Sequence, residues 1–203
     1  MANTGLPEEE SWRADTYRLL AALLLRAPTE GLLDRLGALS STFDEPVNDP
    51  LAAAWKELAT RARLNSPEEI AEEYLTLFIG PPRGELMPYA SWYLTGFLME
   101  KPLAELRKDL ARLGIARRPG MNEPEDHVAA LCESLCLLIS SGEMDQAEFF
   151  ARHLHPWVGK FFLDLRNAGS ARFYRAVAEL GLEFIRLERA CLGLEDTPST
   201  RLT

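Results

Sequence analysis

The densest group of chemically active side chains is the six-residue segment 122–127, Asn-Glu-Pro-Glu-Asp-His. It holds three carboxylates and one imidazole, together with a proline that restricts the backbone. Glu123 or Asn122 could cap a helix that has Pro124 at its first position and acidic residues in its first turn. Carboxylates at such an edge also accept bidentate hydrogen bonds from an arginine of a partner. The residues alone fit a structural cap and a binding edge equally well.

Asp126 and His127 are the pair that could act as an acid and a base. Adjacent residues on a helix point about 100° apart, so the two do not form a direct hydrogen-bonded dyad. No GxSxG motif supplies a nucleophile, and neither GxxxxGK[ST] nor GxGxxG supplies a phosphate site. Gly80 and Gly84 enclose two prolines, which lack the amide donors of a phosphate cradle. A hydrolase or nucleotide-using enzyme with Asp126 and His127 as its acid-base groups is therefore the alternative function.

Cysteine and histidine do not form a recognisable metal site. Cys132 and Cys136 share a helix face, but they lie within an apolar run and no CxxC pair accompanies them. His153 and His155 lie just before Pro156, at a spacing that does not put both rings on one helix face. We expect the cysteines to fill the core and a histidine to cap the following helix, with no metal and no cofactor.

Composition excludes several classes of partner. The 203 residues carry a net charge of −9, and 47% of them are apolar, as in a globular protein. An acidic surface opposes the binding of nucleic acid and anionic lipid, because both require cationic footprints. The chain has no run of about 18 apolar residues, and acidic residues precede the apolar segment 19–25, so we expect neither membrane insertion nor a secretion signal. Three cysteines without framework spacing indicate a reduced, cytoplasmic protein.

Apolar residues recur at helical spacing along most of the chain. No alternating run of strand length is present, so we expect an all-α fold, a single globular domain over residues 1–203 with about nine or ten helices. The strongest helix start is residues 66–69, Ser-Pro-Glu-Glu, which combine a cap, a first-position proline and an acidic first turn. The expected helices cover roughly residues 9–25, 29–39, 51–64, 66–79, 102–113, 124–141, 144–154, 156–167 and 171–192. The central helix at 124–141 is apolar nearly all round, so we expect neighbours to bury it on several sides.

Two long breaks separate strong helices, at residues 80–91 and 114–123, and such loops commonly carry function. The first break leads into three large aromatic residues, Tyr89, Trp92 and Tyr93. Plain linkers seldom contain so many aromatics, so we expect apolar pockets of the kind that capture peptide side chains. The second break is a candidate hinge between N- and C-terminal helical halves, which would permit a monomer or a domain-swapped dimer.

Three blocks of sequence resemble the TorD/DmsD family of redox-enzyme maturation chaperones. Residues 74–81, Tyr-Leu-Thr-Leu-Phe-Ile-Gly-Pro, are similar to the family's aromatic-x-x-Leu-Phe-x-Gly-Pro helix end. Residues 122–127 contain its Glu-Pro-x-Asp-His hallmark. Residues 153–157, His-Leu-His-Pro-Trp, and residues 173–176, Phe-Tyr-Arg-Ala, look like its His-Leu-x-Pro-Trp and Phe-Tyr blocks. The blocks occur in the family's order, and the likeness is greatest to the DmsD branch.

The resemblance implies a cytoplasmic, TorD-like helical chaperone that is not an enzyme. Members recognise the twin-arginine signal peptide of a molybdoenzyme catalytic subunit. They hold the precursor of this molybdopterin oxidoreductase subunit until cofactor insertion is finished, before export. A purely structural subunit of a helical complex is a further alternative, and it would show no preference for twin arginines.

Carried onto this sequence, the resemblance implies a signal-peptide site made by the aromatic block, its loop and the Asp-His pair. The two arginines of the client would meet the carboxylates, and its apolar stretch would pack on the aromatic residues. Tyr74, Pro82 and Tyr89 stand where the DmsD branch shows tryptophan, so the client is open among several molybdoenzymes. The residues expected to bind the signal peptide are Tyr74, Leu77, Phe78, Tyr89, Trp92, Glu123, Asp126 and His127.

Overall fold

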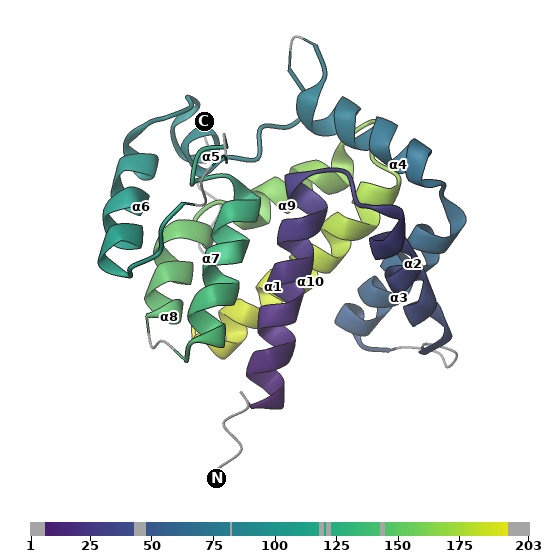
Figure 1. Ribbon diagram of the computed structural model, residues 1–203, viewed down its shortest axis with the longest axis horizontal. Helices are drawn as coiled ribbons and strands as arrows, with labels where there is room; N and C mark the ends of the chain where they lie inside the picture. Colours follow the sequence, from purple (N-terminus) through teal and green to yellow (C-terminus); the bar gives the residue numbers. More distant parts are fainter. Residues whose placement is uncertain are drawn as a thin grey trace.

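The computed structural model describes residues 7–42, 48–81, 83–117, 120, 123–142 and 145–194. Within these ranges the chain forms ten α-helices, one 3₁₀ segment, two π-helical segments and no strand, which confirms the all-α prediction (Figure 1). The elements are α1 (Glu8–Leu25), α2 (Glu30–Ala38), η1 (Leu39–Thr42), α3 (Pro50–Leu64), α4 (Pro67–Tyr74), η2 (Leu75–Ile79), α5 (Ala90–Thr95), α6 (Lys101–Arg112), α7 (Val128–Ser140), α8 (Gln146–Phe149), η3 (Phe150–Leu154), α9 (Val158–Asn167) and α10 (Phe173–Cys191).

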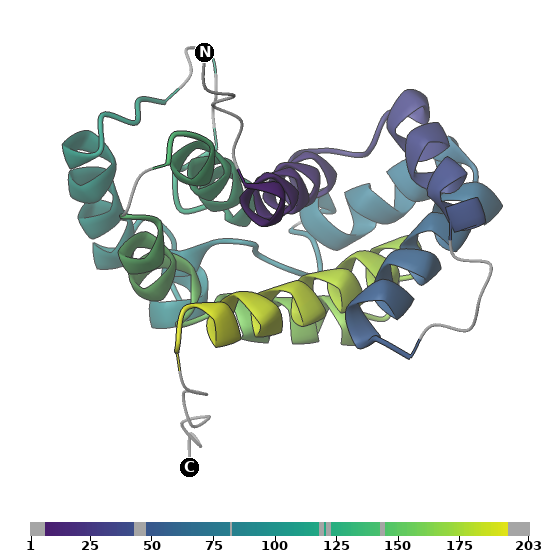
Figure 2. The ribbon, with the colours of Figure 1, turned by 90° about the horizontal axis from the view of Figure 1, so that it is seen from below.

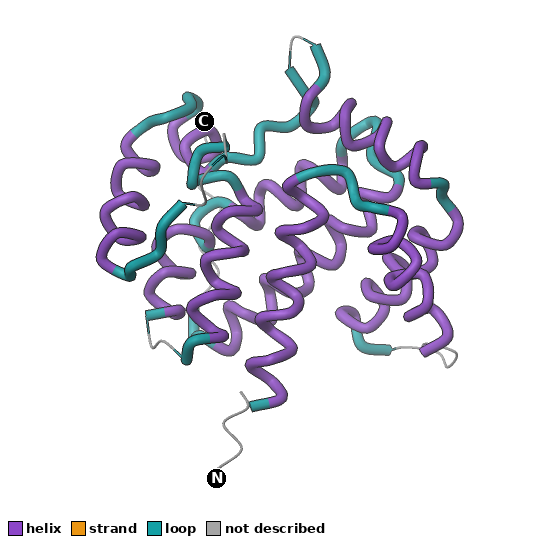
Figure 3. The backbone as a smooth tube through the Cα atoms, in the orientation of Figure 1, coloured by secondary structure: helices purple, strands orange, loops and turns teal. Residues whose placement is uncertain are grey.

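Long helices in two layers form the centre of the fold. α1 packs along α7, while α10 packs against α9 and α3 in the layer below (Figure 2). The prediction of a central helix buried on several sides is confirmed for α7, in which Val128, Leu131 and Ile139 are fully buried. The irregular stretch between η2 and α5 runs across the end of these helices (Figure 3). No described helix is both long enough and apolar enough to cross a membrane.

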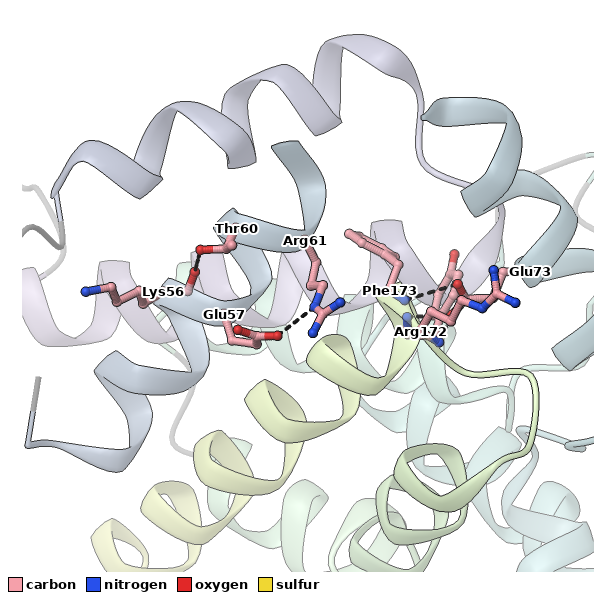
Figure 4. A network of polar contacts seen from close by, with 8 residues as sticks. Lys56, Glu57, Thr60, Arg61, Glu73, Arg172 and Phe173 are labelled. Atoms are coloured by element: carbon pink, nitrogen blue, oxygen red, sulfur yellow. Dashed lines mark hydrogen bonds and ion pairs between the residues drawn. The ribbon is translucent and has the colours of Figure 1, made fainter. Parts of the chain in front are cut away.

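The N-terminus of α10 is capped by a residue from a distant helix. The carboxylate of Glu73, in α4, accepts backbone hydrogen bonds from Arg172, Phe173 and Tyr174 at 2.8, 3.0 and 2.8 Å (Figure 4). A carboxylate at this position satisfies amides that have no partner within the helix and interacts favourably with the helix dipole. The contact fixes α4, and the η2 segment that continues it, to the central helix α10.

A buried ion pair joins α1 to α10. Arg13 donates from Nε and Nη2 to the two carboxylate oxygens of Glu188 at 2.6 and 2.9 Å. The hydroxyl of Tyr17 donates to the same carboxylate at 3.0 Å. Burial, reinforced by the negative charge of Glu188, raises the pKa of Tyr17 well above its ordinary value, so the phenol remains a donor. The carboxylate is therefore paired and hydrogen-bonded although it has no contact with solvent.

The observed helices depart from the sequence expectation at two places near the 122–127 segment. The helix expected from Pro124 begins at Val128, because the preceding residues form a turn in which the amide of His127 donates to the carbonyl of Pro124 at 3.1 Å. The short helix α5 occupies part of a stretch that was expected to be loop. Asn122 and three other residues of the candidate hinge at 114–123 lie outside the described residues, and the hinge stays a prediction.

Candidate functional site

Asp126 is buried and holds the start of α5. It is 1% exposed, and its Oδ2 accepts a hydrogen bond from the amide of Ser91 at 2.9 Å. Its main-chain carbonyl accepts a second one from the amide of Ala90, also at 2.9 Å. These are the free amides of a helix N-terminus, where a carboxylate is favourable. Asp126 therefore positions α5 and the aromatic residues on it, and its carboxylate is not open to a partner.

His127 is the cap of α7. Its Nδ1 accepts a hydrogen bond from the amide of Ala129 at 3.1 Å, and the ring is 4% exposed. Burial lowers the pKa of His127 from 6.5 to about 4, although the nearby carboxylates of Glu123 and Asp126 act in the opposite direction. The imidazole is consequently neutral at pH 7. Because Nδ1 is an acceptor, Nε2 carries the proton.

The stretch between η2 and α5, which ends at Tyr89, is called the aromatic loop here. Tyr89 links this loop to the 122–127 segment. It forms an isolated antiparallel bridge with His127, and the two rings meet edge to face with centroids 5.1 Å apart. The Tyr89 hydroxyl donates to Oε2 of Glu123 at 2.5 Å. Burial, followed by the contact with Glu123, raises the pKa of Tyr89, so the phenol stays protonated. Tyr89, Glu123 and His127 thus form one connected group.

Tyr74, Leu77 and Phe78 lie in the core instead of on a binding surface. Their exposed fractions are 8, 0 and 8%. The rings of Tyr74 and Phe78 pack against Tyr174, and the Tyr74 hydroxyl donates to the carbonyl of Leu25 at 2.8 Å. Their burial follows from aromatic and aliphatic residues recurring at helical spacing, which is typical of a core face. These three side chains therefore pack within the protein, and their direct contact with a signal peptide stays a prediction.

Trp92 is half-buried and lies beneath a cation. The guanidinium of Arg83 lies 5.2 Å from the centroid of the indole ring. The π-helical segment η2 points Leu77 and Phe78 inward and leaves Leu75 and Ile79 exposed, at 53 and 58%. Of the aromatic residues predicted to bind the signal peptide, Tyr89 and Trp92 are half-buried and keep accessible surface, whereas Tyr74 and Phe78 are buried.

A pocket of about 90 Å³ lies along α7, between that helix and the C-terminal ends of α1 and α6. Its polar lining includes three carboxylates, and we call it the acidic pocket. Apolar side chains from Leu25, Leu110, Ile115 and Leu137 form much of the rest of its wall. The polar residues that line it are Arg117, Glu123, Glu125, His127, Glu133 and Ser134.

Two of the three carboxylates in the acidic pocket have no cationic partner among the described residues. Glu125 is paired: Arg107 donates to its Oε2 from Nε and Nη2 at 3.0 and 2.8 Å. Partial burial opposes ionisation of Glu125, but the hydrogen bonds from Arg107 prevail and lower its pKa. Among the described residues, the side-chain carboxylate of Glu123 accepts only from the neutral phenol of Tyr89, and half-buried Glu133 makes no ion pair. The pocket retains negative charge for a cationic ligand.

Arg117 is the cation among the described residues that line the acidic pocket. Its Nη2 donates to the main-chain carbonyl of Glu123 at 2.7 Å, and its charge helps to lower the pKa of Glu125. It makes no ion pair shorter than 4 Å with a described carboxylate. The guanidinium thus lies beside the acidic pocket without neutralising a particular side chain.

Sequence reasoning missed Glu133 and Arg117. Glu133 is the single charged residue of α7, in the segment Val-Ala-Ala-Leu-Cys-Glu-Ser-Leu-Cys-Leu-Leu-Ile-Ser. A lone charge in an otherwise apolar helix is a signal that could have found it, because such a group is costly to bury without purpose. Arg117 carried no comparable signal, since its position beside Glu123 depends on how the chain turns between α6 and α7.

Asp126 and His127 are not arranged as an acid-base pair. The carboxylate of Asp126 bonds to the start of α5, whereas Nδ1 of His127 bonds to the start of α7. Among the described residues, no group of three or more His, Cys, Asp or Glu side chains could hold a metal ion. Cys132 and Cys136 are buried in the core, as expected. The expected histidine cap is wrong: the N-cap of α9 is Trp157, with no side-chain cap hydrogen bond, and His153 hydrogen-bonds to Asp109 at 2.9 Å.

The family described as nitrate reductase delta subunit matches residues 44–163, more than half of the chain. A chaperone protein TorD from Vibrio cholerae serotype O1 (strain M66-2) is 31% identical over 201 residues, covering 89% of this chain and 91% of that relative. A chaperone protein TorD from Aliivibrio fischeri (strain ATCC 700601 / ES114) is 29% identical, covering 87% and 92%. The chain belongs to the TorD family of chaperones.

A solved structure shows that the fold is shared more widely. The crystal structure of a protein assigned to redox enzyme maturation, from Archaeoglobus fulgidus, superposes with a TM-score of 0.58. It is 19% identical and covers 91% of this chain and 98% of that chain. The all-helical, TorD-like architecture expected from the sequence is therefore confirmed.

Family membership also decides between the classes of function. The chain is a chaperone of the TorD family, and the relatives that it matches are named as chaperones, so the hydrolase alternative is set aside. The relatives named here are TorD chaperones, and they do not distinguish the DmsD branch, which stays a prediction.

Proposed function

We propose that the protein binds the twin-arginine signal peptide of a molybdoenzyme catalytic subunit. It holds this precursor in the cytoplasm until the cofactor is inserted, before export. It does so without inserting into the membrane. The protein acts as a monomer or as a domain-swapped dimer, and size-exclusion chromatography distinguishes these two states. The observation that carries the proposal is the acidic pocket, in which Glu123 and Glu133 have no cationic partner among the described residues.

An arginine of the signal peptide fits this charge distribution. A guanidinium donates to carboxylates through a planar fork, and hydrogen bonds between charged groups are stronger than neutral ones. In the proposed complex Glu123 and Glu133 accept from the client, while Glu125 keeps its contact with Arg107. The neutral state of His127 supports this arrangement, since an imidazolium at the pocket would repel the client.

The apolar stretch of the signal peptide has surface to pack on beside the acidic pocket. Leu25, Ile115 and Leu137 border the pocket, and Leu137 is 53% exposed. Tyr89, whose hydroxyl bonds to Glu123 of the pocket, and Trp92 of α5 provide further accessible aromatic surface. Asp126 and His127 contribute by holding the starts of α5 and α7, and the carbonyl of Leu77 accepts a hydrogen bond from the amide of Leu86 in the loop at 2.9 Å.

Calorimetric titration with a signal peptide that carries Arg-Arg tests the proposal. We expect Glu123→Gln combined with Glu133→Gln to weaken binding by about tenfold or more, because the arginine loses two charged acceptors. Replacing Arg-Arg by Lys-Lys in the peptide should also weaken binding to the wild type, since lysine cannot form the bidentate contact. The matched control is Glu148→Gln, an exposed carboxylate on α8 outside the acidic pocket. Equal affinity for both peptides, or equal effects of both sets of variants, would contradict the proposal.

Replacement of Arg117 is expected to act in the opposite direction. Arg117→Ala removes a like charge from the edge of the acidic pocket and should strengthen binding of the Arg-Arg peptide by about fivefold at low salt. The gain should shrink at about 0.5 M salt, because exposed charges are then screened. Arg117→Lys retains the charge and is the control. Titration of all three proteins at two salt concentrations measures the effect, and a loss of affinity in Arg117→Ala would mean that Arg117 contacts the client favourably.

A further inference from the structure

A second charged pocket, of opposite sign, lies in the corner between α1 and α2. It has a volume of about 370 Å³ and is lined by Arg18 from the middle of α1, by Arg26 directly after α1 and by Arg35 from α2. We call it the arginine pocket. Its floor is apolar, with Leu19, Ala22, Pro28 and Leu32 among the lining residues. Such a cationic site is unusual on a chain whose net charge is −9.

The arginines of this pocket are largely free of carboxylate partners. Arg18 is paired with Asp15, which also lines the pocket and is the acidic residue in its lining. Arg26 and Arg35 are exposed, and neither makes an ion pair with a described residue. Both lie near helix C-terminal ends, where a cation is favourable for the helix dipole. The helix dipole accounts for Arg26 at the end of α1 and for Arg35 at the end of α2. It does not account for both arginines lining the same pocket.

The arginine pocket adjoins the acidic pocket. Leu25, the last residue of α1, lines the acidic pocket, and the next residue, Arg26, lines the arginine pocket. One helix end therefore separates a site that favours cations from a site that favours carboxylates. A single extended polypeptide that carries both kinds of charge can reach both sites.

We propose that the arginine pocket binds an acidic segment of the client polypeptide, next to the segment that enters the acidic pocket. That the bound polypeptide is the client rests on the proposed function. That the pocket prefers a carboxylate-rich peptide rests on the arginines that line it. Guanidinium groups bind carboxylates through bidentate hydrogen bonds. The apolar floor accommodates the methylene groups of glutamate side chains.

Fluorescence anisotropy with a labelled hexaglutamate peptide tests the preference directly. We expect the wild-type protein to bind it and Arg26→Glu combined with Arg35→Glu to weaken binding by about tenfold or more. The matched control, Lys108→Glu combined with Arg175→Glu, changes net charge equally at exposed positions outside the pocket and should alter affinity less than about twofold. Thermal melts followed by circular dichroism establish that both variants are folded.

Three results would overturn the inference. These are no binding of hexaglutamate to the wild type, equal weakening in both charge-reversed variants, and displacement of the peptide by pyrophosphate at a lower concentration than by unlabelled hexaglutamate. The last result would assign the pocket to a small anion instead of a peptide.

A second titration separates this inference from the proposed function. An Arg-Arg signal peptide is compared with the same peptide extended by six glutamates. The extension should raise affinity for the wild type by about tenfold and leave affinity for the Arg26→Glu, Arg35→Glu variant unchanged. If hexaglutamate binds but the Arg-Arg peptide does not, the proposed function fails while the arginine pocket stands. If the Arg-Arg peptide binds and the extension adds nothing, the arginine pocket is not part of client binding.

Discussion

Glu188→Ala is expected to lower the free energy of unfolding by about 3–5 kcal/mol, because it leaves the buried guanidinium of Arg13 without its counter-charge. Glu188 is fully buried and accepts two hydrogen bonds from Arg13 and one from Tyr17. The same substitution also removes the acceptor of the buried phenol. Urea denaturation at pH 7, followed by circular dichroism, measures the loss.

The control for this prediction is Glu183→Ala, in the same helix. Glu183 pairs with Arg186 at 2.9 Å, but the arginine side chain is 65% exposed, so the loss should be under about 1 kcal/mol. Replacing both partners, Arg13→Met with Glu188→Leu, should cost less than Glu188→Ala alone, since no charge is then left buried. A double replacement as costly as the single one would show that packing, and not the unpaired charge, dominates.

The general architecture was predictable because helical periodicity reports which faces are buried. α7 was expected to be buried on several sides from its apolar residues alone, and it is. The start at Ser66 was also predictable: Ser66 and Glu69 form a reciprocal capping box. Both signals lie within one or two helical turns, so no knowledge of distant contacts was needed.

Helix ends that depend on distant residues were not predictable. α5 is six residues long, too short to be stable by itself, and its start is held by Asp126, 35 residues later in the chain. Glu73 caps α10 across about a hundred residues, and Arg13 meets Glu188 across 175. Local sequence contains the donors and acceptors of these contacts but does not say which of them will meet.

The candidate site was predicted in part. The link between Tyr89 and the 122–127 segment is present, but the carboxylate of Asp126 is used within the fold. Tyr74, Leu77 and Phe78 belong to a block that resembles the family, and they were expected to bind the signal peptide. Their side chains are buried in the core, so packing alone can account for this motif. Glu133 and Arg117 join the acidic pocket through tertiary structure, since they come from a central helix and from the turn between α6 and α7.

Acidification is expected to destabilise the protein through His127. Its pKa is about 4 in the fold, below the value of 6.5 for an exposed histidine, because the ring is buried. Between these two values the unfolded chain binds more protons than the folded one. The stabilisation is therefore complete above pH 6.5 and is lost as the pH falls toward 4, and at pH 5 the loss is about 2 kcal/mol.

His127→Asn tests this expectation, because asparagine can cap α7 but does not titrate. The difference in free energy of unfolding between pH 7.5 and pH 5 should be about 2 kcal/mol smaller in the variant than in the wild type. Parallel pH profiles for the two proteins would mean that other groups cause the acid sensitivity.

Burial of the His127 imidazole also keeps a positive charge out of the acidic pocket. If the imidazole of His127 kept its ordinary pKa, a part of the molecules would carry a cation beside Glu123 near neutral pH. That cation would offset one of the two carboxylates that have no cationic partner among the described residues. Holding the ring in the core fixes the start of α7 and at the same time keeps an imidazolium away from the acidic pocket at pH 7. The residue that costs stability in acid thus leaves in place the negative charge on which the proposed function depends.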